Sequence, residues 1–247
     1  MKPIVKTENL CLKFGGVMGA DSINFELYEG EKLAVIGQNG AGKTTFINIC
    51  TGYLKPDFGK VFFDGKEVTS LSPRKIVRLG LGRSFQIPQL FTEHTVRECL
   101  EISSASRSGT LSYLRTLAHS VDSREIDETL ELVGLTSDAK ALSSDLPEGK
   151  KKLLDVAMAL ALKPKLLIMD EPTSGVASED KHDLMNMVMN ALEQRKVTSW
   201  FVEHDEDIVE KYATRVAAWI SGKIVADGKP EEVLRNPMIR SEVLGDL

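Results

Sequence analysis

The segment KLAVIGQNGAGKTTFINICT, residues 32–51, runs from a short apolar stretch through a glycine-rich turn into a helical pattern. Residues 33–36 are typical of a buried strand, and Phe46, Ile47 and Ile49 are apolar positions of the helix. Between them, Gly-Gln-Asn-Gly-Ala-Gly-Lys-Thr fits the pattern G-x-x-x-x-G-K-[ST] in the strand–loop–helix context that the pattern requires. The segment therefore predicts a phosphate-binding loop.

The residue types of this loop explain how it would hold phosphate. Glycines let the backbone curl so that successive N–H groups point at phosphate oxygens, and a helix beginning near Gly42 adds the positive end of its dipole. We expect Lys43 to reach the β- and γ-phosphates of a nucleotide, and the Thr44 hydroxyl to bind Mg²⁺. A glycine-rich turn that binds nothing stays open as the alternative, because short patterns also match by chance. The candidate binding residues are Gly37, Gln38, Asn39, Gly40, Ala41, Gly42, Lys43, Thr44 and Thr45.

The composition is that of an ordinary globular protein. The chain has 247 residues, of which 42% are hydrophobic and 27% charged, enough for one large domain or two small ones. A net charge of −5 provides no basic field, so we expect no nucleic-acid partner. Cys11, Cys50 and Cys99 form neither a metal-ligand spacing nor a disulfide framework, which favours a reducing cytosol. The N-terminus lacks the core of a signal peptide, and no apolar run approaches the ~18 residues that span a bilayer.

Residues 4–28 are typical of two strands that meet at a Gly15-Gly16 turn, and Asp64-Gly65 predicts a second hairpin. Phe14 ends the first strand just before its turn. The residues alone favour a half-buried strand aromatic there, while a ring that stacks on adenine is the functional alternative.

A strand is expected at residues 81–85, and Gln86 follows its end directly. Ligands of α/β sheets bind at the carboxyl ends of strands, so Gln86 is either a satisfied loop side chain or part of a site. From Thr95 to about Leu162 helical periods dominate, which indicates a helical insert. Residues 109–120 are polar and weakly patterned, and their pattern predicts no element.

Lys150, Lys151 and Lys152 stand in the first turn of a predicted helix, where the helix dipole favours anions instead. Local rules are most often broken at functional sites. The cluster is therefore either neutralised by Asp145 and Glu148 on a solvated face or part of an anion-binding site.

Two further strands end in polar side chains. Residues 165–169, which are apolar after Lys165, predict a strand that is followed by Asp170 and Glu171, and buried carboxylates are costly unless they are paired or bound to metal. We expect Asp170 to hold Mg²⁺ through water, and Glu171 to orient or deprotonate an attacking water. Residues 198–202 form another buried strand, after which His204 could touch a γ-phosphate, although a lone histidine is more often structural.

The ordered set of GQNGAGKT, Gln86, LPEGK, LLIMDEP and VEHD resembles the ATP-binding subunit of ABC transporters over roughly residues 4–245. The resemblance implies an α/β fold of the P-loop NTPase type, with a mixed sheet, an antiparallel β subdomain and a helical subdomain. Residues 1–247 would form one ABC ATP-binding domain. Its core with the β subdomain would comprise residues 1–86 and 164–247, and its helical subdomain residues 87–163.

The resemblance also implies roles for single residues and two small-molecule ligands, ATP and Mg²⁺. Phe14 would stack on the adenine, Glu171 would be the catalytic base, His204 the switch histidine, and Lys43 would act on the phosphates. Thr44, Gln86 and Asp170 would serve the metal. In this family two domains enclose two ATP molecules, each between one phosphate loop and the partner's signature motif. The signature residues here are Leu146, Pro147, Glu148, Gly149 and Lys150.

Longer segments, including FGGVMGADSINFEL and GRSFQIPQLFTEHTVREC, resemble the branched-chain amino-acid uptake group of that family. The expected function is therefore transport-coupled ATP hydrolysis in an importer for branched-chain amino acids or related amides. Its expected partners are a second ATP-binding subunit, a copy or a paralogue, and an integral-membrane permease that docks between about Phe85 and Thr116. A solute-binding protein would be linked indirectly, and the chain would be cytoplasmic and peripheral on the inner face of the membrane.

Two departures from the family pattern bear on turnover. Pro147 replaces the signature serine and has neither hydroxyl nor backbone N–H, and Glu148 adds a negative charge. The loop after Glu171 reads Ser174-Gly175-Val176-Ala177, without its usual aspartate. The rival functions are the ATPase of a lipid-export ABC system, a soluble non-transport ABC ATPase, and a nucleotide-dependent docking module with little hydrolysis.

Overall fold

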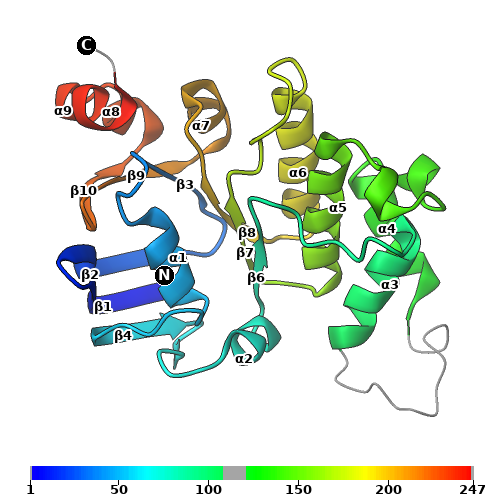
Figure 1. Ribbon diagram of the computed structural model, residues 1–247, viewed down its shortest axis with the longest axis horizontal. Coiled ribbons are helices and arrows are strands. Elements are labelled where there is room, and N and C mark those ends of the chain that lie inside the picture. Colours follow the sequence, from blue (N-terminus) through cyan, green and yellow to red (C-terminus); the bar gives the residue numbers. More distant parts are fainter. Residues whose placement is uncertain (1, 108–120, 246–247) are drawn as a thin grey trace.

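Two β-sheets and a set of helices make up the part of the protein that the computed structural model describes, residues 2–107 and 121–245 (Figure 1). The strands are β1 (Pro3–Phe14), β2 (Val17–Tyr28), β3 (Lys32–Gly37), β4 (Phe58–Phe63), β5 (Lys66–Glu67), β6 (Leu81–Ser84), β7 (Leu166–Asp170), β8 (Thr198–Val202), β9 (Arg215–Ile220) and β10 (Lys223–Gly228). The helices are α1 (Lys43–Cys50), α2 (Pro73–Arg78), α3 (Val96–Arg107), α4 (Ser123–Leu132), α5 (Glu148–Ala161), α6 (Lys181–Gln194), α7 (Glu206–Tyr212), α8 (Pro230–Leu234) and α9 (Pro237–Ile239). Short turns of other helix types are η2 (Thr136–Asp138), η3 (Ser143–Asp145) and η4 (Arg240–Leu244).

The two sheets differ in strand direction. One has four antiparallel strands in the order β2-β1-β4-β5. The other has the order β10-β9-β3-β8-β7-β6, in which only the β10–β9 pair is antiparallel. The predicted α/β fold, a mixed sheet with an antiparallel sheet beside it, is therefore confirmed.

The predicted turns join the predicted strands. β1 and β2 meet at Gly15-Gly16, and β4 and β5 meet at Asp64-Gly65. Asp64 and Gly65 both have positive φ, 47° and 72°, which a two-residue hairpin loop requires when it follows the right-handed twist of the strands.

Alternating side chains of the six-stranded sheet enter two separate hydrophobic cores. Leu33 and Val35 of β3 face the antiparallel sheet, together with Phe46 of α1, whereas Ala34 and Ile36 face the opposite side. On the first side Phe25, Phe46, Trp200 and Trp219 form an aromatic cluster with ring centroids 5.3–6.4 Å apart. The α1 helix, which follows the phosphate loop, is thus held between the two sheets.

The opposite core is covered by α5, α6 and α7 (Figure 1). The apolar pattern of residues 178–195 predicts a helix with Met187 facing inward. In the structure α6 begins three residues later, at Lys181, and buries Met185 and Met189, whereas Met187 is only half-buried. No helix was predicted at α7. Among the described residues, no helix is both long and apolar enough to cross a membrane.

In the described part of residues 87–163, all the named elements are helices or helical turns. The assignment of this region to a separate subdomain stays a prediction. Residues 109–120, whose sequence predicts no element, lie outside the described residues.

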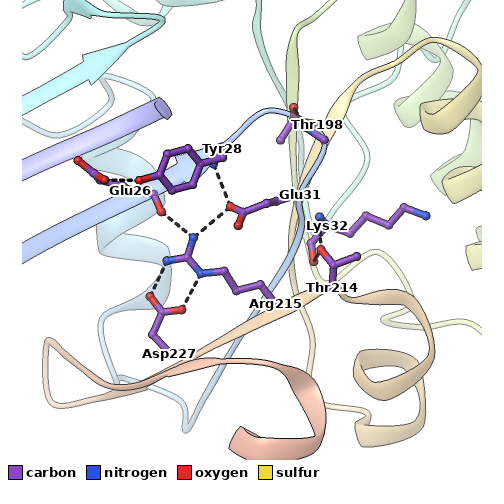
Figure 2. A network of polar contacts seen from close by, with 9 residues as sticks. Glu26, Tyr28, Glu31, Lys32, Thr198, Thr214, Arg215 and Asp227 are labelled. Carbon is purple, nitrogen blue, oxygen red and sulfur yellow. Dashed lines mark hydrogen bonds and ion pairs between the residues drawn. The ribbon is translucent and has the colours of Figure 1, made fainter. Parts of the chain in front are cut away.

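Arg215 of β9 connects the two sheets (Figure 2). Its guanidinium donates to both carboxylate oxygens of Asp227 on β10 at 2.7 Å, and to the Glu26 carbonyl of β2 at 2.8 Å. A fourth hydrogen bond reaches the Glu31 carboxylate at 3.0 Å, and the Asp227 contacts are the main reason that the pKa of Arg215 is raised. The planar fork of Arg suits this set of acceptors, which a lysine ammonium cannot match.

We expect Arg215→Met to lower the free energy of unfolding by about 2–3 kcal/mol, because hydrogen bonds to charged groups contribute about 1.5–3 kcal/mol and two acidic partners lose their cation. Arg215→Lys should recover part of the loss. The midpoint of urea unfolding at unchanged slope measures both. Lys223→Met, which removes an exposed ion pair with Asp21, is the control, and equal effects of Arg215→Met and Lys223→Met would contradict the role of the network.

Candidate functional site

The phosphate loop has the backbone that its glycines predict. Gly40 and Gly42 have φ of 82° and 104°, and a Cβ on Gly42 would stand 2.5 Å from the Gly19 carbonyl oxygen. Only glycine therefore fits at position 42. Lys43, 6% exposed, donates to the loop carbonyls of Gly37 at 2.5 Å and Gln38 at 3.1 Å. Burial lowers the pKa of Lys43, and the nearby carboxylates of Glu171 and Asp170 oppose that effect.

The loop and the residues around it fit a nucleotide phosphate with Mg²⁺. No side chain caps the start of α1, and its first turn holds no acidic residue. A Cβ built on Gly40 meets nothing within 4 Å, so the loop is open there. In the described part of the chain, no group of three His, Cys, Asp or Glu side chains is arranged to hold a metal alone. Sparse protein ligands are what Mg²⁺ uses when it is shared with substrate phosphates.

Phe14 lies beside this loop. A Cβ on Gly19 would meet the Phe14 ring at 2.8 Å and the Thr45 methyl at 3.0 Å. The ring is 48% exposed, which agrees with the half-buried strand aromatic that the residues alone favoured. An exposed ring next to a phosphate loop leaves the stacking role available.

The carboxyl ends of β6, β7 and β8 bring three predicted side chains together. The Gln86 amide donates to Glu171 Oε2 at 2.6 Å, and His204 Nε2 lies 3.2 Å from Glu171 Oε1. Glu171 has a φ of 50°, which is uncommon outside glycine and tends to occur at functional sites. The sequence placed these residues at strand ends, and the parallel sheet joins them in one cluster.

Asp170, 7% exposed, forms an ion pair with Arg83 that was not predicted from the sequence. Arg83 donates to Asp170 Oδ2 at 3.1 Å and to Asn48 Oδ1 of α1 at 2.6 Å. Its guanidinium also lies over the Phe85 ring, 4.8 Å from the centroid. A basic residue inside the predicted strand 81–85 was the available signal, because a charge in a buried strand needs a partner.

Glu203 is a second residue that the sequence analysis did not assign. It is 4% exposed and accepts hydrogen bonds from the Thr173 N–H at 3.0 Å and the Thr173 hydroxyl at 2.8 Å. Burial raises the pKa of its carboxyl, and the Thr173 bonds partly reverse that. Glu203 thereby ties the loop after Glu171 to the end of β8, beside His204.

The three lysines of α5 have three different partners. Lys150 pairs with Asp138 at 2.8 Å and Lys151 with Glu148 at 3.0 Å. Lys152 is buried, and its ammonium donates to the Gln86 carbonyl and, at 3.2 Å, to the Glu171 carbonyl. Of the two alternatives, the solvated cluster neutralised by Asp145 and Glu148 does not describe Lys152, and the partner of Lys150 is Asp138 instead of Asp145.

The predicted signature residues surround the start of α5. Pro147 is the N-cap of α5, Leu146 is buried, and Pro147 and Glu148 are exposed. Within the described residues, no hydrogen bond or ion pair joins Leu146–Lys150 to the phosphate loop of the same chain. In Figure 1, β7 and β8 lie between α5 and α1.

Comparison with known proteins decides the family. The family model described as ABC transporter matches residues 20–174, which include the phosphate loop, the signature segment and the Asp170–Glu171 strand end. The chain belongs to the ABC transporter family. The predictions of this family and of an ABC-type ATPase are thereby confirmed.

Curated relatives align with this ABC chain over nearly its whole length. It is 37% identical to a probable branched-chain amino acid transport ATP-binding protein, LivG, of Archaeoglobus fulgidus, over 98% of this chain and 95% of the relative. It is 30% identical to the high-affinity branched-chain amino acid transport ATP-binding protein LivG of Escherichia coli, over 99% of each chain. Among solved structures, the ADP conformation of MJ1267, an ATP-binding cassette of an ABC transporter, matches with a TM-score of 0.84 at 31% identity over 98% of each chain.

Asp155 of α5 holds the segment around Gln86 and has a strongly perturbed acidity. Its carboxylate accepts the Phe85 N–H at 3.0 Å and the Gln89 N–H at 3.3 Å. Burial raises its pKa from 3.8 to about 6, against the lowering effects of those N–H groups and of Lys152.

We expect this carboxyl to make stability depend on pH. The folded protein holds the proton of Asp155 more tightly than the unfolded chain does. The free energy of unfolding is therefore unaffected by this carboxyl below about pH 4, and it falls progressively as the pH rises to about 6. The difference between the pKa of Asp155 in the folded protein and in the unfolded chain corresponds to about 3 kcal/mol of free energy. Relative to Asp155→Asn, the wild type should therefore lose about 2–3 kcal/mol of unfolding free energy from about pH 4 to pH 7 in urea titrations. Parallel pH curves for the two proteins would contradict the assignment.

Proposed function

We propose that the chain is the ATP-hydrolysing subunit of an importer for branched-chain amino acids or related amides, and that it drives a separate membrane permease. The convergence of Gln86, Glu171 and His204 at the end of the sheet that carries the phosphate loop supports hydrolysis. The names of relatives that align over nearly the full chain support the transported class. The rival lipid-export and non-transport functions have no comparable support.

The phosphate-loop residues Gly37 to Thr45 would hold the ATP phosphates, with Lys43 leaving its carbonyl partners to neutralise the β- and γ-phosphates. Phe14 would stack on the adenine ring. Thr44, Asp170 and Gln86 would hold Mg²⁺, which supplies charge stabilisation on the transferred phosphoryl group. Arg83 donates to one oxygen of the Asp170 carboxylate at 3.1 Å, and this contact would orient the other oxygen toward Mg²⁺.

Glu171 would act as the general base, because its carboxylate is the acceptor on which Gln86 and His204 converge. It would take a proton from water as the water oxygen bonds to the γ-phosphorus and the bond to the ADP oxygen breaks. His204 would orient Glu171 and donate a hydrogen bond to the γ-phosphate. The Glu203–Thr173 hydrogen bond and the left-handed backbone of Glu171 would set the position of the Glu171 carboxylate before ATP binds.

A second ATP-binding subunit would complete each nucleotide site. The start of α5 would face the nucleotide on the partner's phosphate loop through Pro147, Glu148, Gly149 and Lys150, with Leu146 buried beneath them. Gly149 has nothing within 4 Å of a built Cβ, which leaves that surface open. Because Pro147 offers no donor, the contact would rest on backbone N–H groups of the first turn and on Lys150.

The permease would dock in a groove of about 790 Å³ between α2, α3 and the end of α5. The groove includes Ala105, Ser106 and Arg107, which fall in the expected docking range of 85–116, and it extends to α2, which that range omits. Residues 108–116 of that range lie outside the described residues. Arg74 and Arg78 line the groove, have no ion pair within the described residues, and favour an acidic permease loop. Three other basic side chains of the lining already pair with acids of this chain, Arg107 and Lys163 with Glu125 and Lys165 with Asp64.

Two substitutions separate binding from hydrolysis. Lys43→Ala should weaken ATP binding, because it removes the cation next to the phosphates. Glu171→Gln should retain binding and slow hydrolysis by about a hundredfold or more, since general base catalysis contributes about 10²–10⁴. Nucleotide affinity by titration calorimetry and phosphate release measure the two effects. Wild-type turnover in Glu171→Gln would refute the general base.

The docking groove is tested by charge reversal on α2. Arg78→Glu should reduce leucine uptake and membrane association of the full chain in cells, because it opposes an acidic partner, while ATP affinity of the purified chain stays the same. Lys60→Glu, on an exposed ion pair of β4 outside the groove, is the matched control. Unchanged uptake in Arg78→Glu would exclude this face as the docking site.

A further inference from the structure

Helix α5 carries two buried charged side chains that are outside the groups proposed to touch the nucleotide. Lys152 and Asp155 are three residues apart, so they are neighbours on one face of the helix. They are 5% and 7% exposed. Because buried charges are costly unless their hydrogen bonds are satisfied, the acceptors and donors that they bind explain why they are there.

Lys152 binds the backbone of two site residues at once. Its ammonium donates to the carbonyl of Gln86 and to the carbonyl of Glu171. These are the same two residues whose side chains share a hydrogen bond of 2.6 Å. One cation therefore fixes the backbone from which each partner of that bond extends.

Asp155 binds the flanks of the same segment. Its two carboxylate oxygens accept the N–H groups of Phe85 and Gln89, on either side of Gln86. Together the two side chains of α5 hold residues 85–89 at three backbone atoms. No other charged side chain in the described residues has a hydrogen bond to the backbone of 85–89.

The backbone of Glu171 needs such support. Its φ of 50° is a left-handed conformation that costs about 1–3 kcal/mol for an ordinary residue and persists only when the surroundings hold it. Three hydrogen bonds do so. The Glu171 N–H donates to the Val202 carbonyl at 3.1 Å, and the Glu171 carbonyl accepts from the Ser174 N–H at 3.1 Å and from Lys152 at 3.2 Å.

The packing beside Lys152 and Asp155 leaves little space for water. The void lined by Phe85, Lys152, Asp155 and Pro172 measures about 10 Å³. That volume is at the lower limit of what holds a water molecule. Removing the Lys152 ammonium would therefore leave two carbonyls without their buried donor.

We propose that Lys152 and Asp155 are positioning residues for ATP hydrolysis, which hold the Gln86 segment and the Glu171 backbone so that the Gln86 amide, the Glu171 carboxylate and the His204 imidazole meet. This inference rests on the proposed function and adds a control point to it. Because α5 begins at the signature motif, the same helix connects the surface offered to a partner's nucleotide with the base of its own site. A shift of α5 would then displace Gln86 and Glu171 together.

The test compares Lys152→Met, Lys152→Arg and Asp155→Asn with the wild type, using the full chain. Lys60→Met, on an exposed ion pair of β4, is the control. Lys152→Met should lower kcat by about ten- to a hundredfold, since misplacement by about 1 Å costs that order of rate, with ATP affinity within about threefold of the wild type. Lys152→Arg should recover part of kcat, and Asp155→Asn should lower kcat without changing ATP affinity.

Two further readouts separate positioning from general destabilisation. In a Glu171→Gln background, Lys152→Met should change residual turnover by less than about twofold, because residues that act through one group are not additive. Amide hydrogen exchange at residues 85–89 and 171–174 should be faster in Lys152→Met than in Lys60→Met by about tenfold. Unchanged kcat, an equal loss in the Glu171→Gln background, or unchanged exchange would each overturn the inference.

A failure of the proposed function would look different. If the wild-type chain does not bind ATP, the proposed function falls, while the exchange measurement still decides whether Lys152 holds the two segments. If the wild type hydrolyses ATP and Lys152→Met does so equally well, only the positioning role falls. A variant that does not fold is replaced by Asp155→Asn, which keeps the size of the side chain and one acceptor.

Discussion

Parallel pairing of β3, β8, β7 and β6 is the constraint on which the site depends. In this register Val35 lies opposite Val202, Asp170 opposite Val202 on the other side, and Ser84 opposite Met169. All four strands therefore end at the same edge. Whatever follows a strand end in the sequence, whether a phosphate loop, a glutamine, a glutamate or a histidine, is delivered to that edge.

The site keeps several charges out of water, and each has a specific partner. Lys43 lies against loop carbonyls, Asp170 against Arg83, and Glu203 against Thr173. Such groups cost free energy to bury and are stable only with their hydrogen bonds complete. In the proposed function, the arrangement would already be organised around the place where phosphate charge enters, and Lys43 would exchange carbonyl oxygens for phosphate oxygens.

The strands and turns were the easiest part to predict, since their signals are local. Gly15-Gly16 and Asp64-Gly65 mark their hairpins, and residues 33–36 alternate between two cores within a wholly apolar run. The start of α6 was predicted less accurately, because Ser178 and Asp180 are both preferred N-cap residues and Asp180 begins the helix without a side-chain cap. Which of Met185, Met187 and Met189 are buried depends on the direction in which α6 packs, and the composition of the helix does not determine that direction.

From the sequence alone came the phosphate loop, the strand-end side chains and the family, because each depends on residue type at fixed short spacing. The residues that hold them came only from the tertiary structure. Arg83 meets Asp170 across 87 positions of sequence, and Lys152 meets Gln86 across 66. Three consecutive lysines do not by themselves show which one is buried, since that depends on how α5 packs against the sheet. Local chemistry is therefore readable from the chain, whereas the partners of buried charges are determined by packing.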